Sequence, residues 1–68
     1  MAEQTFAVGF SSTNDPDRDA ELILLEDERH TLPEIQAVCR RYGVIALVSV
    51  DGRVAVAGVN ADGQVAWR

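Results

Sequence analysis

Lysine is absent from this chain of 68 residues, and cysteine, methionine, tryptophan and tyrosine each occur once. All six basic residues are arginine, and eleven acidic residues leave a net charge of −5 at pH 7. A protein that binds nucleic acid needs a basic surface to neutralise phosphates, so this acidic balance argues against that function. The single cysteine, Cys39, excludes an intramolecular disulfide.

Long apolar runs and targeting signals are also missing. The longest apolar run covers residues 44–48, whereas a membrane-spanning helix needs about 18 residues or more. The first residues, MAEQTF, lack the basic and apolar regions of a secretory signal. We therefore expect a cytoplasmic protein that does not bind a membrane.

Recognisable catalytic motifs are missing as well. The sequence contains no G-x-S-x-G, Walker or G-x-G-x-x-G motif. One histidine and one cysteine do not have the spacing of a zinc site. We therefore expect neither an enzyme nor a bound cofactor or metal.

The residues that are abundant are small and apolar. Hydrophobic residues make up 47% of the chain, and valine and alanine contribute nine each. A chain of this length buries only about 60% of its unfolded surface. We therefore predict one small domain over residues 1–68, with a core built from small side chains.

The clearest local pattern is that of a helix. Thr31 and Glu34 have the spacing of a capping box, in which each side chain bonds a free backbone amide at the helix start. Pro33 falls in the first turn, where its missing N–H costs nothing. Gly43 follows the last apolar residue of the stripe and is typical of a helix end. The pattern predicts a helix over 32–42.

Residues 20–26 carry two conflicting signals. Alanine, glutamate and leucine favour a helix. The apolar run, however, covers only residues 22–25, and this length is typical of a buried strand. A second helix here would also leave almost no connection to the helix over 32–42. We therefore predict a strand over 20–26, with a helix as the alternative.

Alternating apolar residues predict the remaining strands, over 5–10, 44–50, 53–59 and 64–68. Asp51-Gly52 predicts a two-residue type I′ turn, and residues 60–63 predict a longer turn. Gly58 lies inside a predicted strand, where glycine marks a bulge or a close contact. The whole pattern predicts an α+β fold, a small antiparallel sheet with one helix packed on one face, in the order β-β-α-β-β-β.

Both faces of the predicted hairpin are apolar. The two-residue turn pairs Val48 with Ala55, which places Ile45 and Leu47 on one face of the sheet and Val48 and Ala55 on the other. One helix covers only one face, and an uncovered apolar face marks a contact site. We therefore predict a homodimer whose interface consists of Val44, Ala46, Val48, Val50, Ala55 and Ala57. The alternative is that the N-terminal loop folds over this face.

Acidic residues are concentrated in the first half of the chain. Residues 1–34 hold nine acids and two arginines, a balance of −7, whereas residues 35–68 hold two acids and four arginines, a balance of +2. Charged surfaces of this kind steer and select partners of opposite charge. We predict that the chain binds a basic region of a protein partner through Asp15, Asp17, Asp19 and Glu21.

The same segment carries a second pattern. Acidic residues stand at positions 1, 3, 5, 7 and 12 of the window 15–26. This spacing resembles that of the calcium loop of the EF-hand family. Ala20 stands where such loops carry glycine, and no helical pattern precedes the window. The main prediction is a solvated acidic loop, and the resemblance implies calcium or small-ligand binding as the alternative.

Three single residues have individual predictions. His30 follows a charged run directly before the predicted helix, so we expect its side chain to be solvated. Cys39 lies on the apolar stripe of that helix, and we expect a buried, unreactive thiol. Trp67 ends the last strand, and we expect it to plug the core.

These observations together predict a non-enzymatic protein–protein interaction module of the adaptor or inhibitor type. We expect it to be a homodimer through an apolar sheet face. The alternative is calcium or small-ligand binding through the acidic segment 15–26. A third hypothesis, nucleic-acid binding, would depend on the four arginines of the second half, Arg40, Arg41, Arg53 and Arg68.

Overall fold

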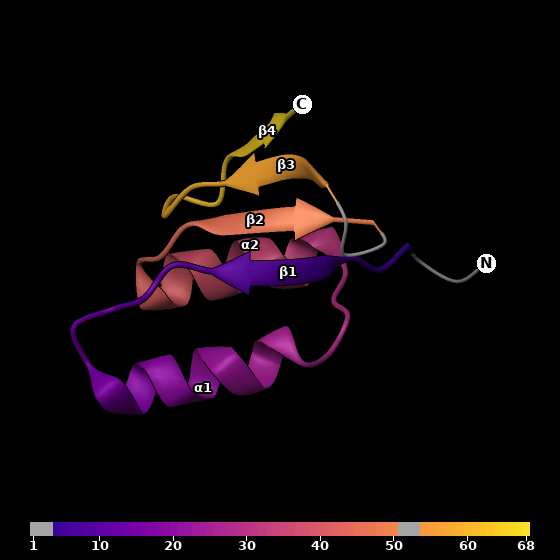
Figure 1. Ribbon diagram of the computed structural model, residues 1–68. Helices are drawn as coiled ribbons and strands as arrows, with labels where there is room; N and C mark the ends of the chain where they lie inside the picture. The colour runs from indigo at the N-terminus through magenta and orange to yellow at the C-terminus, as the bar shows by residue number, and fades with distance from the viewer. Residues whose placement is uncertain (1–3, 51–53) are drawn as a thin grey trace.

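The computed structural model describes residues 4–50 and 54–68, which form two helices and four strands. In chain order the elements are β1 (Ala7–Phe10), α1 (Pro16–Glu26), α2 (Leu32–Tyr42), β2 (Ala46–Ser49), β3 (Ala55–Val59) and β4 (Val65–Trp67). The strands form one antiparallel sheet in the order β1-β2-β3-β4 (Figure 1). The predicted α+β class is confirmed. The order is β-α-α-β-β-β, with two helices in place of the predicted one.

The strand predicted over residues 20–26 is wrong, because this segment belongs to helix α1. Asp15 caps the helix, Pro16 occupies its first turn, and Asp17 and Asp19 lie where the helix dipole favours negative charge. The helical propensity of Ala, Glu and Leu outweighs the short apolar run. That run is not a buried strand, since only its first residue, Leu22, is buried.

Helix α2 is confirmed with the predicted bounds. Gly43 ends it in the left-handed conformation, at φ 66°, which costs glycine little. The predicted capping box is not closed. The Thr31 hydroxyl makes no bond to a free amide and instead donates to Glu34 Oε1 at 3.1 Å.

The core lies between α2 and the inner face of the sheet. Figure 1 shows α2 behind the strands, whereas α1 lies beside them, next to the edge strand β1. Ile35 and Cys39 of α2 are fully buried and pack with Ala46, Val48, Ala57 and Val59 of the sheet. Helix α1 holds the edge of β1 through Glu26, whose carboxylate accepts the backbone N–H of Phe10 at 2.9 Å.

The register of the β2–β3 hairpin differs from the prediction by two residues. Val48 pairs with Ala57 rather than with Ala55, and a bulge falls between Val48 and Ser49. The shift is two over residues 46–48 and keeps these side chains on their predicted faces, because the side-chain period of a strand is also two. Beyond the bulge, Ser49 pairs with Ala55, a shift of one residue. The predicted Asp51-Gly52 turn lies outside the described residues.

The predicted turn at residues 60–63 is confirmed. Gly63 has a φ of 82°, and the side-chain oxygen of Asn60 accepts the backbone N–H groups of Asp62 and Gln64, both at 2.9 Å. Trp67, by contrast, is 61% exposed and does not plug the core. It lies on a short edge strand, and Val65 makes the contact with the core there.

Candidate functional site

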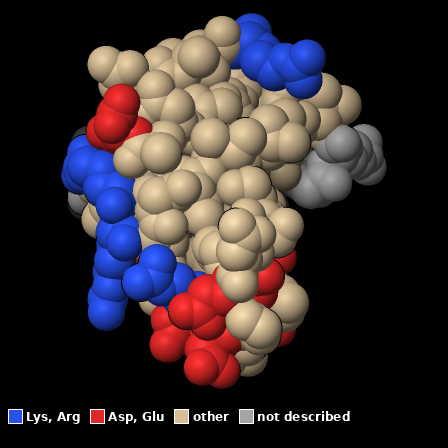
Figure 2. Space-filling view, turned by 90° about the vertical axis from the view of Figure 1, so that its left-hand side faces the viewer, with Lys and Arg blue, Asp and Glu red and all other residues tan. Residues whose placement is uncertain are grey.

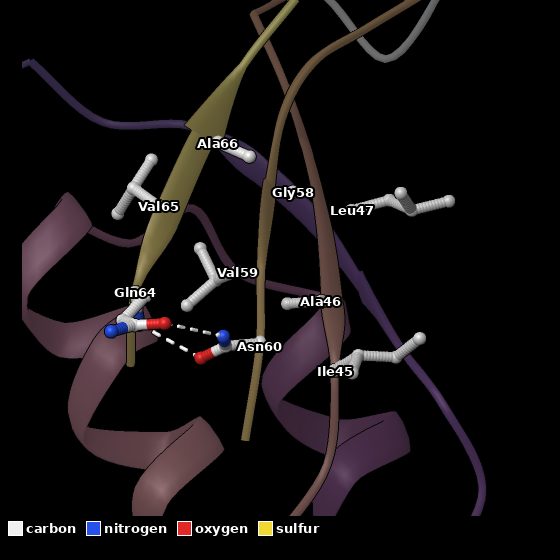
Figure 3. Close-up of a pocket in the computed structure, with 9 residues that line it drawn as sticks. All are labelled: Ile45, Ala46, Leu47, Gly58, Val59, Asn60, Gln64, Val65 and Ala66. Atoms are coloured by element: carbon white, nitrogen blue, oxygen red, sulfur yellow. Dashed lines mark hydrogen bonds between the residues drawn. The ribbon is translucent and has the colours of Figure 1, made fainter. Parts of the chain in front are cut away.

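The outer face of the sheet, which points away from α2, is apolar and uncovered. Ile45 and Leu47 of this face are 55% and 61% exposed. Figure 3 shows both side chains projecting to one side of the sheet, whereas Val59 and Val65 lie on the other. A solvated sheet face usually carries polar side chains. Exposed apolar side chains gathered here therefore mark a candidate contact surface.

Leu47 stands between residues with almost no side chain. In the register of the sheet, the row across its four strands is Gly9, Leu47, Gly58 and Ala66. Leu47 therefore rises above the row as a single knob. A shallow depression of about 370 Å³ lies on the side of Gly58 and Ala66. Another, of about 270 Å³, lies on the side of Gly9.

The fold itself does not require glycine at position 58. Its φ is not positive, and a Cβ added there would come no closer than 3.9 Å, to the carbonyl oxygen of Ala46. A Cβ on Gly9 would likewise stay 3.9 Å from Glu26 Oε2. Glycine weakens a strand and often marks a place where another backbone or a ligand comes close. The bare positions beside Leu47 are therefore part of the candidate contact surface.

The predicted dimer interface lies on the opposite, inner face, and that prediction is corrected. Val44, Ala46, Val48 and Ala57 are between 0% and 3% exposed, Val50 packs against the core, and Ala55 is half-buried. Alternation in the sequence gave two apolar faces but did not tell which of them α2 covers. The helix covers the face of the predicted interface, so Ile45 and Leu47 remain exposed.

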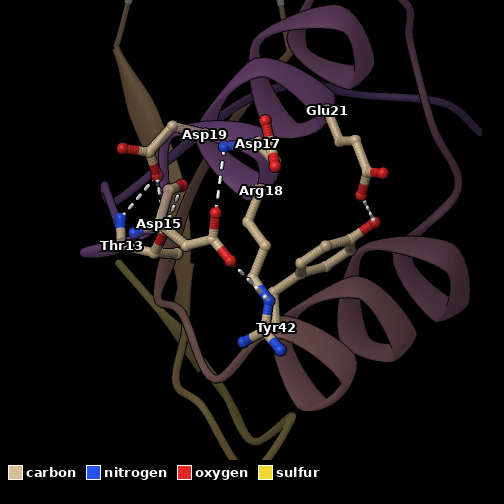
Figure 4. Close-up of polar contacts among 7 residues, drawn as sticks. All are labelled: Thr13, Asp15, Asp17, Arg18, Asp19, Glu21 and Tyr42. Atoms are coloured by element: carbon tan, nitrogen blue, oxygen red, sulfur yellow. Dashed lines mark hydrogen bonds and ion pairs between the residues drawn. The ribbon is translucent and has the colours of Figure 1, made fainter.

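The acidic residues predicted to bind a partner are largely engaged within the molecule (Figure 4). Asp15 Oδ1 accepts the backbone N–H of Asp17 at 3.0 Å and thereby caps α1. Asp19 Oδ1 accepts both the backbone N–H and the hydroxyl of Thr13, at 2.6 and 2.8 Å. These carboxylates stabilise the start of α1, and their role in partner binding stays a prediction.

The fourth of these acids, Glu21, links the two helices. Its Oε2 accepts the hydroxyl of Tyr42 at 2.6 Å. This hydrogen bond is the main cause that raises the pKa of Tyr42. Of these four acids, Asp17 is the one whose carboxylate accepts no hydrogen bond from residues 4–50 and 54–68. The predicted acidic residues therefore do not form one site: Asp15 and Asp19 stabilise the start of α1, and Glu21 connects α1 to α2.

The window that resembles a calcium loop does not form a loop. Most of it is α1, and alternate residues of a helix lie about 200° apart around the axis, so their side chains diverge. Within the described part of the chain, no three His, Cys, Asp or Glu side chains lie together in an arrangement that could hold a metal ion. These residues therefore give the calcium alternative no support.

His30 was predicted to be solvated, but it is 8% exposed and joins the two helices. Its Nδ1 lies 3.1 Å from Glu34 Oε2, and its Nε2 lies 2.8 Å from the carbonyl oxygen of Leu25. Both partners only accept hydrogen bonds, so the ring satisfies both only as the doubly protonated cation. Burial lowers the pKa of His30. The bonds to Glu34 and Leu25, with the charges of Glu34 and Glu28, raise the pKa by more than burial lowers it, so it lies above 6.5.

Cys39 is buried, as predicted, with an exposed fraction of 0%. Burial is the main cause that raises the pKa of its thiol. A buried thiol of raised pKa is a poor nucleophile, so Cys39 serves packing.

Acidic side chains gather in one part of the surface. Figure 2 shows acidic side chains gathered at the lower end, where α1 lies, and arginines on the neighbouring side. Uncharged surface fills most of the middle of this view, with a further basic group at the top and an acidic one at the upper left. No helix within residues 4–50 and 54–68 has the length and apolar character to cross a membrane.

Sequence reasoning noticed Gly58 but missed its neighbour across the strands, Leu47. The missing information was which face of the sheet helix α2 covers. The usable signal was a glycine inside a strand of valine and alanine, which no turn explains. No family model matches this chain, and neither does a curated protein or a solved structure.

Proposed function

We propose that this protein is a non-enzymatic protein–protein interaction module that forms a homodimer through the outer face of its sheet. The observation that carries the proposal is the Leu47 knob beside the bare Gly58–Ala66 depression. In a two-fold dimer the same surface contacts itself. Leu47 of each copy would then enter the depression of the other, so a single surface supplies both the knob and the hole.

The distribution of charge supports a second copy as the occupant. A molecule with a net charge of −5 repels its own copies, so a self-contact needs a face free of acids. The row through Leu47 holds no charged residue. The acids of α1 lie beside β1 at one edge, and Arg68 follows β4 at the other (Figure 1). A two-fold axis parallel to the strands places these opposite edges together.

The size of the face sets the expected strength. Four strands about 4.8 Å apart and about five residues long cover roughly 300 Å². A standard interface buries about 800 Å² on each partner. The contact is therefore of the weak class, and we expect a dissociation constant in the micromolar range rather than an obligate dimer.

Sedimentation equilibrium over a range of concentrations tests this proposal. The wild-type chain should pass from monomer to dimer mass as its concentration rises through roughly 1–500 µM. Leu47→Ser should remain a monomer throughout. Leu24→Ser is the matched control, since Leu24 is 68% exposed but lies on α1, and it should dimerise like the wild type.

Either of two results would contradict the proposal. One is a wild-type chain that stays monomeric at the highest concentration. The other is equal loss of dimer in the Leu47 and Leu24 variants, which would make the effect one of general hydrophobicity. Circular dichroism of both variants checks that the fold persists, as expected for exposed positions.

A further inference from the structure

A groove runs between the two helices, on a surface separate from the outer sheet face. Helices α1 and α2 run in opposite directions, with α1 displaced to the side of the sheet (Figure 1). The space between them measures about 520 Å³ and is lined by Leu24 and Leu25 of α1, Tyr42 of α2, and Asp27 and Glu28 of the connection. Its residues come from both helices, so their relative position defines it.

The walls of the groove are apolar and held in place. Leu24 is 68% exposed and Leu25 is half-buried. The Tyr42 ring is half-buried, and its hydroxyl is tied to Glu21 across the two helices at 2.6 Å. The Arg41 guanidinium lies 5.6 Å from the centre of the Tyr42 ring. Apolar side chains that a small protein leaves exposed in a fixed groove are available to a partner.

One end of the groove carries negative charge, although the end of helix α1 that lies there favours positive charge. The last turn of a helix is its negative end and favours cations. The last turn of α1 has no basic residue, and Glu26, Asp27 and Glu28 follow one another there. The Glu26 carboxylate accepts the N–H of Phe10. Asp27 and Glu28 make no side-chain hydrogen bond or ion pair with the rest of the described chain.

We propose that this groove binds a basic amphipathic helix of a partner protein. An apolar stripe on such a helix contacts Leu24, Leu25 and Tyr42, and a lysine or arginine near its end meets Asp27 and Glu28. The eleven residues of α1 span about 16 Å, which matches about three turns of the incoming helix. Arg41 also lines the groove, and there Glu21, which is bonded to Tyr42, offsets its charge. Asp27 and Glu28 are therefore the part of the groove that attracts a cation, and they favour one direction of the bound helix.

The test uses a synthetic peptide of about twelve residues with leucine at helical spacing and arginine at the remaining positions. Binding is followed by amide chemical shifts of the labelled protein. The arginine peptide should shift residues 24–28 and 41–42, and a peptide with the same leucines but glutamate for arginine should not bind.

Two neighbouring substitutions provide the control for position. Leu24 and Ile23 are 68% and 60% exposed on the same helix, but only Leu24 lines the groove. Leu24→Ser should weaken peptide binding by about tenfold or more, the loss expected when one leucine is no longer buried. Ile23→Ser should leave the affinity unchanged. Equal effects of the two substitutions, or no binding of the arginine peptide at millimolar concentration, would overturn the proposal.

A third comparison examines charge and separates this proposal from self-association. Asp27→Asn combined with Glu28→Gln should weaken binding of the arginine peptide and reduce its dependence on salt. Unchanged affinity would contradict the predicted role of these acids. Leu47→Ser should bind the peptide as the wild type does, because the groove and the outer sheet face are separate. Loss of binding in that variant would show that the peptide occupies the sheet face instead.

Discussion

Helices α1 and α2 have the same length, eleven residues, but very different roles in the fold. Helix α2 buries Ile35 and Cys39 completely in the main core. Helix α1 buries only Leu22, which lies outside that cluster, and exposes Ile23 and Leu24. The apolar residues of α2 therefore stabilise this chain, whereas most of those on α1 face solvent.

The two helices also differ in their electrostatics. Helix α2 has Glu34 in its first turn and Arg40 and Arg41 in its last, which complements its dipole at both ends. Helix α1 has acids at both ends. A helix whose apolar and charged residues are only partly satisfied within the chain is a natural place for partner contacts. The position of α1 beside the sheet also explains why the outer face stays uncovered.

The largest effect expected from this comparison is on stability. Ile35→Ala in α2 should lower the free energy of unfolding by about 2–5 kcal/mol, because it leaves a cavity at a fully buried site. Leu24→Ala in α1 should change it by less than about 0.5 kcal/mol. Urea denaturation measures both. Similar losses in the two variants would mean that α1 contributes to the core as α2 does.

The two N-caps should differ by a smaller amount. Asp15→Ala should cost about 1 kcal/mol, because its carboxylate accepts the backbone N–H of Asp17. Thr31→Ala should cost no more than a few tenths of a kcal/mol, since the Thr31 hydroxyl makes no capping bond. The same denaturation experiment compares them. A larger loss for Thr31→Ala would show that the capping box closes in solution.

The smallest expected effect is a pH dependence of the unfolding free energy, which comes from the contacts of His30 with Leu25 of α1 and Glu34 of α2. The pKa of His30 lies above 6.5 in the folded chain, so its contribution to stability is complete below pH 6.5 and is lost as the pH rises through the folded pKa. The hydrogen bond to His30 is the main cause that lowers the pKa of Glu34 below 4.5. Its contribution is therefore lost as the pH falls through that lower value. We expect a stability maximum between these limits.

The chain has one histidine, so proton NMR reports this titration without ambiguity. A His30 pKa at or below 6.5 would contradict the geometry of two acceptors around the ring. His30→Gln serves as the control, and it should flatten the dependence of unfolding free energy on pH above 6.5.

Local chemistry allowed part of the fold to be predicted. Helix 32–42, the turn at 60–63 and the burial of Cys39 depend on spacing and turn residues that act over a few positions. The strand over 20–26 failed because its apolar run was read as buried, whereas α1 exposes most of it. Its N-terminal signals, Asp15 and Pro16, were visible in the sequence and pointed to a helix.

The candidate site was harder to predict, because it depends on contacts between distant segments. Alternation identified both apolar faces of the sheet, but only the placement of α2 decides which one is covered. The acids at 15, 17, 19 and 21 were predicted to form one site, but most of them make hydrogen bonds within the molecule that stabilise α1 or connect the two helices. The burial of His30 depends on Leu25 and Glu34 together, and no local pattern indicates that contact.

The central claim is that the bare position at Gly58 receives a second copy of the chain. Gly58→Val tests it most directly, because a Cβ added there makes only an ordinary van der Waals contact, 3.9 Å from the carbonyl oxygen of Ala46, and valine suits a strand. Sedimentation equilibrium should show that this variant stays monomeric at concentrations where the wild type dimerises, while its unfolding free energy is unchanged or rises by up to about 1 kcal/mol. Dimerisation of Gly58→Val with wild-type affinity would contradict the account.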